Sequence, residues 1–319
     1  MATSARATRP IDVLALGAAA VDDLLFVDAY PPPDSKCEIA RHERRIGGLA
    51  AVALIAAVRM GARAAYAGCL CEEESARFVR LGLQAEGVSV GHIVPRAAAL
   101  PFRSTIVVDL STGSRTIMFD ASSVYGADAE LPAEEVIRSS AVLLVDHVGL
   151  AGMARAARIA RAAGIPVVAD FERAGRPPFD ELFELSNHLI LPAAFAKSLT
   201  GATSSEEAVR ALWKQTREAV VVTEGELGSW YASLAEGGRV FHEEAFRVQT
   251  RDTTGCGDVF HGVYAAALAK GLPIQDRVRL ASATAALTAA RGRGASGIPR
   301  LAEVEDYIGA YGRQGQRYD

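Results

Sequence analysis

The chain has 319 residues, half of them apolar, and its 34 Lys and Arg against 38 Asp and Glu give a formal charge of −4. The apolar content excludes a disordered chain, and the slightly acidic balance disfavours a general affinity for nucleic acid or anionic membranes. Four cysteines without C-x-x-C spacing predict reduced thiols rather than a disulfide framework or a zinc site, and we expect a cytoplasmic protein.

Strands and helices alternate from the beginning of the chain. Residues 11–17 form a short apolar run that ends in Gly and predicts a buried strand. Gly47-Gly48 precede an Ala-rich helix that runs to Met60 and is stopped by Gly61. The pattern then predicts a strand over 64–68 and a helix over 72–85.

The middle of the chain repeats this alternation. Apolar runs predict strands over 141–146, 165–170 and 219–223, and a helix over 150–163 ends before Gly164. Strands that alternate with helices indicate βαβ units and a parallel sheet, with functional sites at the carboxyl ends of the strands. We therefore expect one α/β domain over residues 1–319, with a doubly wound, mostly parallel sheet flanked by helices.

Two extended stretches, 37–46 and 102–119, interrupt the alternation, and Ser111–Ser114 is a good turn within the second. Because no helix separates their strands, they predict a small separate β-sheet. Such a sheet, with strands from about 23–46 and 98–121, is a candidate lid over a site. The alternative is ordinary decoration of a sheet edge.

The segment Asp252-Thr253-Thr254-Gly255-Cys256-Gly257-Asp258 precedes an apolar helix that runs to about Ala269. Small residues at a helix start let backbone N–H groups bind an anion, which the helix dipole also favours. An acid in that turn either accepts a proton from an attacking hydroxyl group or only caps the helix. The residues alone leave both interpretations of Asp258 open.

This segment resembles the D-T-x-G-A-G-D signature of the ribokinase family of carbohydrate kinases (phosphofructokinase-B type), with Cys256 as the one departure. The run from Gly47 to Ala62 resembles the family's G-G-x-x-x-N-x-A…R-L-G-A run. Residues 220–229 resemble its V-V-T-x-G-x-x-G strand and turn, and Leu16-Gly17 followed by Asp22 fits its opening strand and substrate aspartate. The resemblance spans residues 11–310, and the carboxyl-terminal half is most similar to sulfofructose kinases.

The resemblance implies that ATP phosphorylates a hydroxymethyl group on a small sugar or sugar derivative. Asp258 would be the base, with the backbone N–H groups of Gly255, Cys256 and Gly257 as an anion hole. Asp22, Gly47 and Gly48 would hold the sugar, and Thr223, Gly225 and Gly228 would bind the nucleotide. Mg²⁺ would accompany ATP, Asp252 and Thr254 would bind a monovalent cation such as K⁺, and the lid would join two subunits in a homodimer.

Two departures from the family pattern affect these expectations. Val52 stands where the family has an Asn that reaches the sugar, and Pro192 and Phe195 stand in place of its N-x-x-E motif. Mg²⁺ would then be held by the ATP phosphates and water, or by acids such as Asp170 or Glu172. A nucleoside kinase and a catalytically weak, ligand-sensing relative are the alternatives.

Two further side chains, and one group of side chains, have two interpretations each. Asp146 either contacts a ligand or stabilises a turn, and His261 either modulates a pKa or packs and caps the helix. The basic residues expected in the lid either bind an anionic sugar or are solvated edge charges, which is the simpler interpretation; they are Lys36, Arg41, Arg44, Arg45, Arg103 and Arg115.

Overall fold

The strands expected in the α/β part lie side by side in one sheet of the computed structural model, which describes residues 9–315. The order is β14 (Val240–Glu243), β13 (Ser229–Ser233), β12 (Ala219–Thr223), β11 (His188–Pro192), β10 (Val167–Asp170), β9 (Ser140–Asp146), β1 (Ile11–Ala15) and β4 (Ala64–Tyr66). Pairing is parallel from β4 to β12, whereas β13 and β14 add an antiparallel hairpin at one edge. The parallel part is as predicted; the hairpin was not foreseen.

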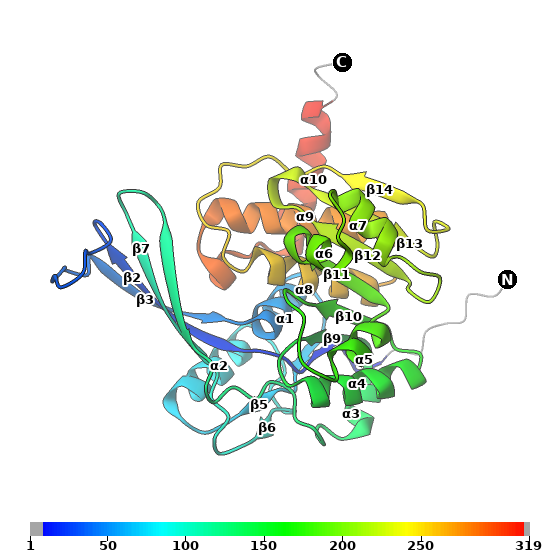
Figure 1. Ribbon diagram of the computed structural model, residues 1–319, viewed down its shortest axis with the longest axis horizontal. Coiled ribbons are helices and arrows are strands. Elements are labelled where there is room, and N and C mark those ends of the chain that lie inside the picture. The colour runs from blue at the N-terminus through cyan, green and yellow to red at the C-terminus, as the bar shows by residue number, and fades with distance from the viewer. Residues whose placement is uncertain (1–8, 316–319) are drawn as a thin grey trace.

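Helices cover both faces of this sheet (Figure 1). Val142 and Leu144 of β9 pack into a core with α1 (Leu49–Arg59), α2 (Glu74–Ala85), α8 (Cys256–Ala269), α9 (Ile274–Arg291) and α10 (Leu301–Gly315). Leu143 and Val145 point the other way, toward α3 (Glu134–Arg138), α4 (Leu150–Ala162), α5 (Phe179–Leu185), α6 (Ala193–Thr200) and α7 (Ser205–Leu212). This arrangement explains why the strands are apolar throughout rather than alternating, because both of their faces are buried.

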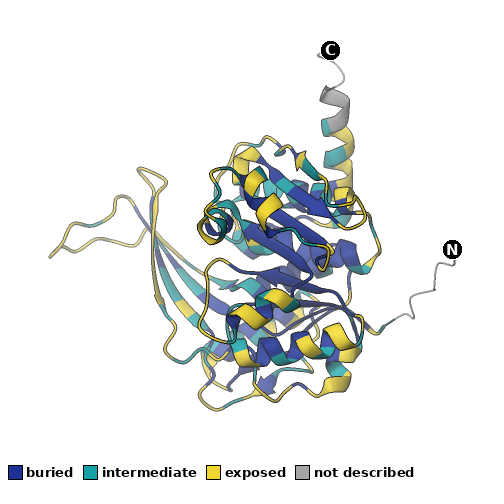
Figure 2. Cartoon of the chain, turned by 45° about the vertical axis from the view of Figure 1, so that its right-hand side comes forward, coloured by how far each residue is buried: buried dark blue, intermediate teal, exposed yellow. Residues whose placement is uncertain are grey.

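Helices α1 and α8 cross at very short range. A Cβ atom at Gly262 of α8 would lie 2.0 Å from the carbonyl oxygen of Ala53 in α1, so only glycine fits at this position. The crossing fixes α8, which is buried over most of its length, against the centre of the sheet, whose strands are largely buried (Figure 2). As a consequence, the first turn of α8 is held next to the beginning of α1 and the carboxyl ends of the central strands.

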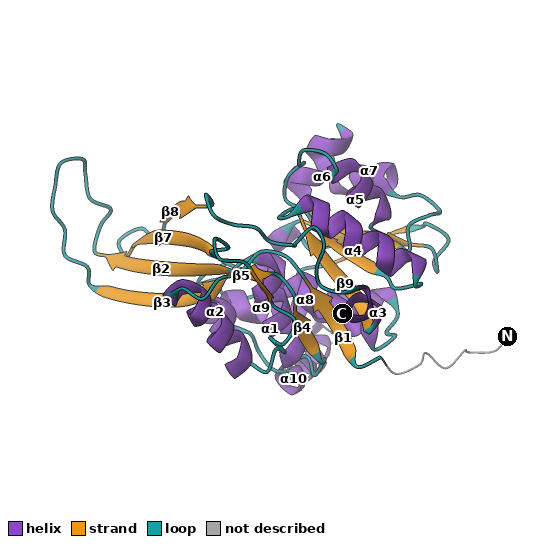
Figure 3. Ribbon diagram, turned by 90° about the horizontal axis from the view of Figure 1, so that it is seen from below, coloured by secondary structure: helices purple, strands orange, loops and turns teal. Residues whose placement is uncertain are grey.

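A second sheet projects from the body with the order β3 (Arg41–Gly47), β2 (Ala20–Val27), β7 (Phe102–Asp109) and β8 (Arg115–Asp120) (Figures 1 and 3). Strand β3 begins at Arg41. The prediction of an extended strand from Cys37 is therefore wrong for residues 37–40, which belong to the loop between β2 and β3. Pro31, Pro32 and Pro33 lie in that loop and have no N–H group for a ladder. A short pair, β5 (Cys69–Leu70) and β6 (Val94–Pro95), completes the strands. Within residues 9–315, no helix has the length and apolarity to cross a membrane.

Candidate active site

The turn before α8 has the geometry of a backbone anion site. Gly255 precedes the helix with φ +76°, a left-handed conformation that glycine adopts without strain. Oδ1 of Asp252 accepts hydrogen bonds from the N–H (2.9 Å) and the hydroxyl (2.6 Å) of Thr254, which shapes the turn. The N–H of Cys256 already donates to the Thr253 carbonyl at 3.2 Å. The N–H groups at the start of a helix have no intrahelical acceptor, so this turn presents donors to a ligand.

A groove of about 860 Å³ runs from this turn to the end of β12. It brings the predicted nucleotide residues Thr223, Gly225 and Gly228 together with Cys256 and Gly257. Its wall was not predicted and is largely apolar, with Ala245, Phe246, Val248, Phe260, Ala285, Ala286 and Ala289 among its residues. The alanines of α9 gave no sequence signal, because an Ala-rich helix has the same pattern with or without a groove beside it.

Asp258 lies in the first turn of α8, close to acids at the carboxyl ends of β9 and β10, namely Asp146, Asp170 and Glu172. Burial, and then the charges of Asp170 and Glu172, raise the pKa of Asp258 well above its usual range. The buried Asp170 also has a raised pKa, because of burial and then the charges of Glu172 and Asp146. A carboxyl group whose proton affinity is raised in this way is suited to accept a proton in a reaction.

Oδ2 of Asp170 is buried and has no hydrogen-bond partner among residues 9–315. The His261 ring lies beside it, with Nδ1 at 3.3 Å from this oxygen. His261 itself bonds to backbone, with Nδ1 2.8 Å from the Gly257 carbonyl and Nε2 3.1 Å from the Ile190 carbonyl. These contacts favour the packing interpretation of His261 and leave the Asp170 oxygen available to a ligand.

Asp146 stabilises the turns around it. One carboxylate oxygen accepts the Ala18 N–H at 2.6 Å and the other accepts the Val148 N–H at 2.8 Å. Burial raises its pKa to about 6, although both N–H groups act to lower it. Gly17 is required beside it, since a Cβ there would lie 1.8 Å from Asp146 Oδ2. The turn interpretation of Asp146 is therefore the one that the structure favours.

Asp22 lies on the face of the four-stranded sheet that meets the body. It is opposite Arg45 on β3 and Ser104 on β7, and a Cβ at Gly47 would lie 2.1 Å from its Oδ2. Burial raises the pKa of Asp22, whereas a hydrogen bond from Ser104 and the charge of Arg45 act to lower it. Gly48 (φ +93°) packs on the backbone of Ala18 and Ala19. The structure thus brings Asp22, Gly47 and Gly48, the residues predicted to bind the sugar, close together. Ser104 lies beside Asp22 as well, but only the pairing register of β2 and β7 shows this.

Asp252 and Thr254, which were predicted to bind a monovalent cation, form hydrogen bonds with an arginine from β8. Arg115 Nη1 donates to Asp252 Oδ1 at 2.6 Å and contacts Thr254 Oγ1 at 2.5 Å. Arg45 Nη1 lies 3.7 Å from the other Asp252 oxygen. Two basic residues of the four-stranded sheet therefore contact the turn before α8, rather than being solvated edge charges.

The raised pKa of Asp258 predicts a pH-dependent effect on stability. In the unfolded chain an Asp ionises near pH 3.9, as is usual for this residue, whereas in the folded chain the carboxylate is disfavoured. Ionised Asp258 therefore destabilises the fold increasingly as the pH rises above that value and through its folded pKa. We expect Asp258→Asn to raise the melting temperature at pH 8, by roughly 2–4 °C per kcal/mol recovered, and to have no such effect at pH 4. Calorimetry across this range checks the trend; a gain that is larger at pH 4 would contradict it.

The family model described as "pfkB family carbohydrate kinase" matches residues 11–301. A 5-dehydro-2-deoxygluconokinase of Shouchella clausii is 26% identical over 94% of this chain and 96% of its own. A ribokinase of Haemophilus influenzae is 24% identical over 92% of this chain and 97% of its own. The solved structure of Arabidopsis thaliana ribokinase with ribose and ATP has a TM-score of 0.81 at 20% identity, and covers 93% of this chain and 98% of that one.

Proposed function

Because the chain belongs to the pfkB family of carbohydrate kinases, we propose that it transfers the γ-phosphoryl group of ATP to a hydroxymethyl group of a small sugar or sugar derivative, with Asp258 as the base. Membership confirms the family resemblance and the enzyme class, a phosphotransferase with an alcohol acceptor. The doubly covered, mostly parallel sheet confirms the expected fold. The similarity of the carboxyl-terminal half to sulfofructose kinases stays a prediction.

The groove between the β12 turn and α8 is the observation that carries the proposal. Its apolar wall at Phe246, Ala285 and Ala286 suits the face of an adenine ring, and its other end reaches Cys256 and Gly257. A nucleotide bound along it would direct its terminal phosphate to the amino terminus of α8. There the N–H groups of Gly255 and Gly257 would bind the transferring phosphoryl oxygens, with that of Cys256 shared with the Thr253 carbonyl.

The sugar would lie between Asp22 and Asp258. Carboxylate oxygens of Asp22 accept hydrogen bonds from sugar hydroxyl groups, and Gly47 and Gly48 permit a close approach. Asp258 would take the proton from the attacking hydroxyl, and its raised pKa makes it a stronger base than an ordinary carboxylate. Phosphoryl transfer needs little covalent chemistry from the protein, so alignment of these groups supplies most of the catalysis.

Asp170 is the residue that fits Mg²⁺. Magnesium prefers oxygen ligands, and the buried Oδ2 of Asp170 lacks a hydrogen-bond partner. When bound, the ion would neutralise charge on the ATP phosphates. The residues in place of the N-x-x-E motif cannot contribute, since neither Pro192, at the end of β11, nor Phe195, in α6, has a side-chain oxygen or nitrogen to offer the ion. Within residues 9–315 no three acidic, His or Cys side chains form a metal cluster, so phosphates and water would complete the coordination.

We also propose that the chain forms a single domain in which the four-stranded sheet is the lid, since Asp22 and Ser104 lie on its inner face; residues 1–8 and 316–319 of the expected domain lie outside the described residues. The homodimer through this sheet stays a prediction. It is consistent with exposed apolar side chains on β8, where Ile117 and Phe119 are 48% and 62% exposed.

The test of the proposed function is ADP release from ATP and Mg²⁺ across a panel of sugars, sugar acids, sulfo-sugars and nucleosides. We expect stimulation by at least one sugar or sugar derivative. Stimulation by nucleosides alone would make the protein a nucleoside kinase. If ligands from the panel shift the melting temperature but none stimulates ADP release, the protein is a sensor and the proposal fails.

A further inference from the structure

Arginine side chains from the four-stranded sheet reach across to the turn that precedes α8. Arg115 comes from β8 and is paired with Val108 of the neighbouring strand β7. Val108 is four residues after Ser104 on β7, so the two side chains are on the same face of the sheet. Side chains alternate along a strand, so Arg115 shares the inner face with Asp22 and Ser104. Its guanidinium bonds to Asp252 and Thr254 (2.6 and 2.5 Å), with Thr253 Oγ1 at 3.5 Å.

The turn has two sources of negative potential. Asp252 is one, and its carboxylate is mostly shielded from solvent, with 20% of the side chain exposed. The carboxyl end of α9 is the other: the Ala289 carbonyl accepts the N–H groups of Arg251 and Asp252, at 2.9 and 3.2 Å. The carboxyl end of an 18-residue helix carries partial negative charge. Without a cation here, both sources would repel a phosphoryl group bound at Gly255 and Gly257, a few residues further along.

The chain supplies that cation itself. Arg45 is largely committed to Glu43 on its own strand, through bonds of 2.9 and 2.5 Å. Arg115 has no acidic partner among the described residues other than Asp252. Burial acts to raise the pKa of Asp252, but hydrogen bonds from Thr254 and the charges of Arg115 and Arg45 outweigh it and lower the pKa. The carboxylate is therefore ionised and paired with a guanidinium.

These contacts do not fit a monovalent cation at Asp252 and Thr254, because the two side-chain oxygens are already bonded to Nη1 of one guanidinium. We propose that Arg115 replaces the monovalent cation: its fixed positive charge holds Asp252 and Thr254, and through them the anion hole, so that the enzyme needs no K⁺. Arginine is suited to this role because it is permanently charged and its planar fork of donors keeps its geometry. The inference rests on the proposed function and makes Arg115 a positioning residue.

A second consequence concerns the sheet. Since the charge is carried by β8 and not by a dissolved ion, it reaches the turn only while the four-stranded sheet lies against the body. The negative charge of Asp252 beside the anion hole is then neutralised by Arg115 only when the sheet also places Asp22 beside the sugar. A potassium ion would be present in either position of the sheet.

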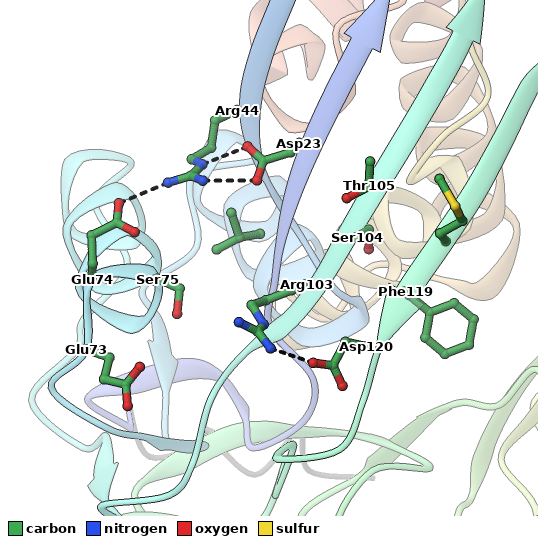
Figure 4. Close-up of a pocket in the computed structure, with 12 residues that line it drawn as sticks. Asp23, Arg44, Glu73, Glu74, Ser75, Arg103, Ser104, Thr105, Phe119 and Asp120 are labelled. Carbon is green, nitrogen blue, oxygen red and sulfur yellow. Dashed lines mark hydrogen bonds and ion pairs between the residues drawn. The ribbon is translucent and has the colours of Figure 1, made fainter. Parts of the chain in front are cut away.

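The test compares the wild type with Arg115→Met, which keeps the apolar stem, and Arg115→Lys, which keeps the charge. Arg103→Met is the matched control: Arg103 pairs with Asp120 (Figure 4), and the strand register places it on the face of the sheet opposite to Ser104 and Arg115. Rates are measured at constant ionic strength in choline chloride, NaCl and KCl. We expect the same rate in all three salts for the wild type and Arg103→Met.

Arg115→Met should lose about 10- to 100-fold in kcat in choline, the range for lost hydrogen bonds to a charged group, and regain part of it with saturating K⁺ or guanidinium. Arg115→Lys should lose less. K⁺ activation of the wild type, or a loss in Arg115→Met that no cation restores, would overturn the proposal.

A measurement without turnover separates this inference from the proposed function. The melting temperature of the ligand-free protein is recorded against K⁺ at constant ionic strength. A saturable rise with K⁺ is expected for Arg115→Met and not for the wild type, whether or not any sugar is phosphorylated. A rise in the wild type, or none in the variant, would show that Arg115 does not occupy a cation site, even if kinase activity is found.

Discussion

Asp258→Asn is expected to abolish sugar phosphorylation while leaving ATP binding intact. Asparagine keeps the size and the polar oxygen of the side chain, and it is tolerated near a helix start, so the groove at Thr223, Phe246 and Gly257 should not change. Only the ability to take a proton is lost. General-base catalysis contributes about 10²- to 10⁴-fold, so kcat should fall by that factor. ADP release measures kcat, and calorimetric titration with a non-hydrolysable ATP analogue measures binding.

Asp276→Asn is the matched control for this prediction. Asp276 is also an acid in the first turn of a helix, α9, but it does not line the groove. If Asp258 only stabilised the start of α8, the two Asn variants would show similar, modest changes. Turnover near the wild-type level in Asp258→Asn would remove the base from the proposed mechanism.

The sequence predicted the parts of this site that depend on local conformation. Gly255 begins α8 in a left-handed conformation, as a small-residue turn before an apolar helix predicts. The buried strands were equally predictable, because apolar runs such as 219–223 fit a sheet covered on both faces. The hairpin of β13 and β14 was missed, and β3 begins later than expected, since prolines in the preceding loop delay the return to pairing.

Contacts between distant segments could not be predicted in the same way. Ser104 meets Asp22 only because β7 pairs with β2 in one register, and a shift by one residue would place Arg103 there instead. Arg115 and Asp252 are 137 residues apart, and the charge pattern alone favoured solvated edge arginines. From the sequence, Asp170 was one of several acids that could hold Mg²⁺. Its burial near Asp258 and its carboxylate oxygen without a hydrogen-bond partner among residues 9–315 distinguish it in the structure. The anion hole could be predicted because its residues are consecutive in the sequence. The charged side chains that support it come from distant segments and depend on the tertiary fold.

Asp22→Asn is expected to weaken sugar binding strongly and ATP binding hardly at all. The Asp22 carboxylate is partly buried between Gly47 and Ser104, and a sugar hydroxyl would replace water as its partner. Hydrogen bonds to a charged group contribute about 1.5–3 kcal/mol each, so the loss of two should lower kcat/KM for the sugar by roughly 10²- to 10⁴-fold. The KM for ATP should stay within about twofold, since Asp22 is not part of the groove.

Asp23→Asn provides the control that makes this prediction specific to one face of the sheet. Asp23 is the next residue on β2 and points to the outer face, where it pairs with Arg44 (Figure 4) and with His42. Exposed ion pairs of this kind contribute about 0–1 kcal/mol, so this variant should change the melting temperature slightly and sugar kinetics not at all. Equal losses of kcat/KM in the two variants would indicate that β2 acts only as a structural strand. A loss confined to Asp22→Asn would support the inner face as the sugar-binding surface, because the two acids are neighbours on β2 that point to opposite faces of the sheet.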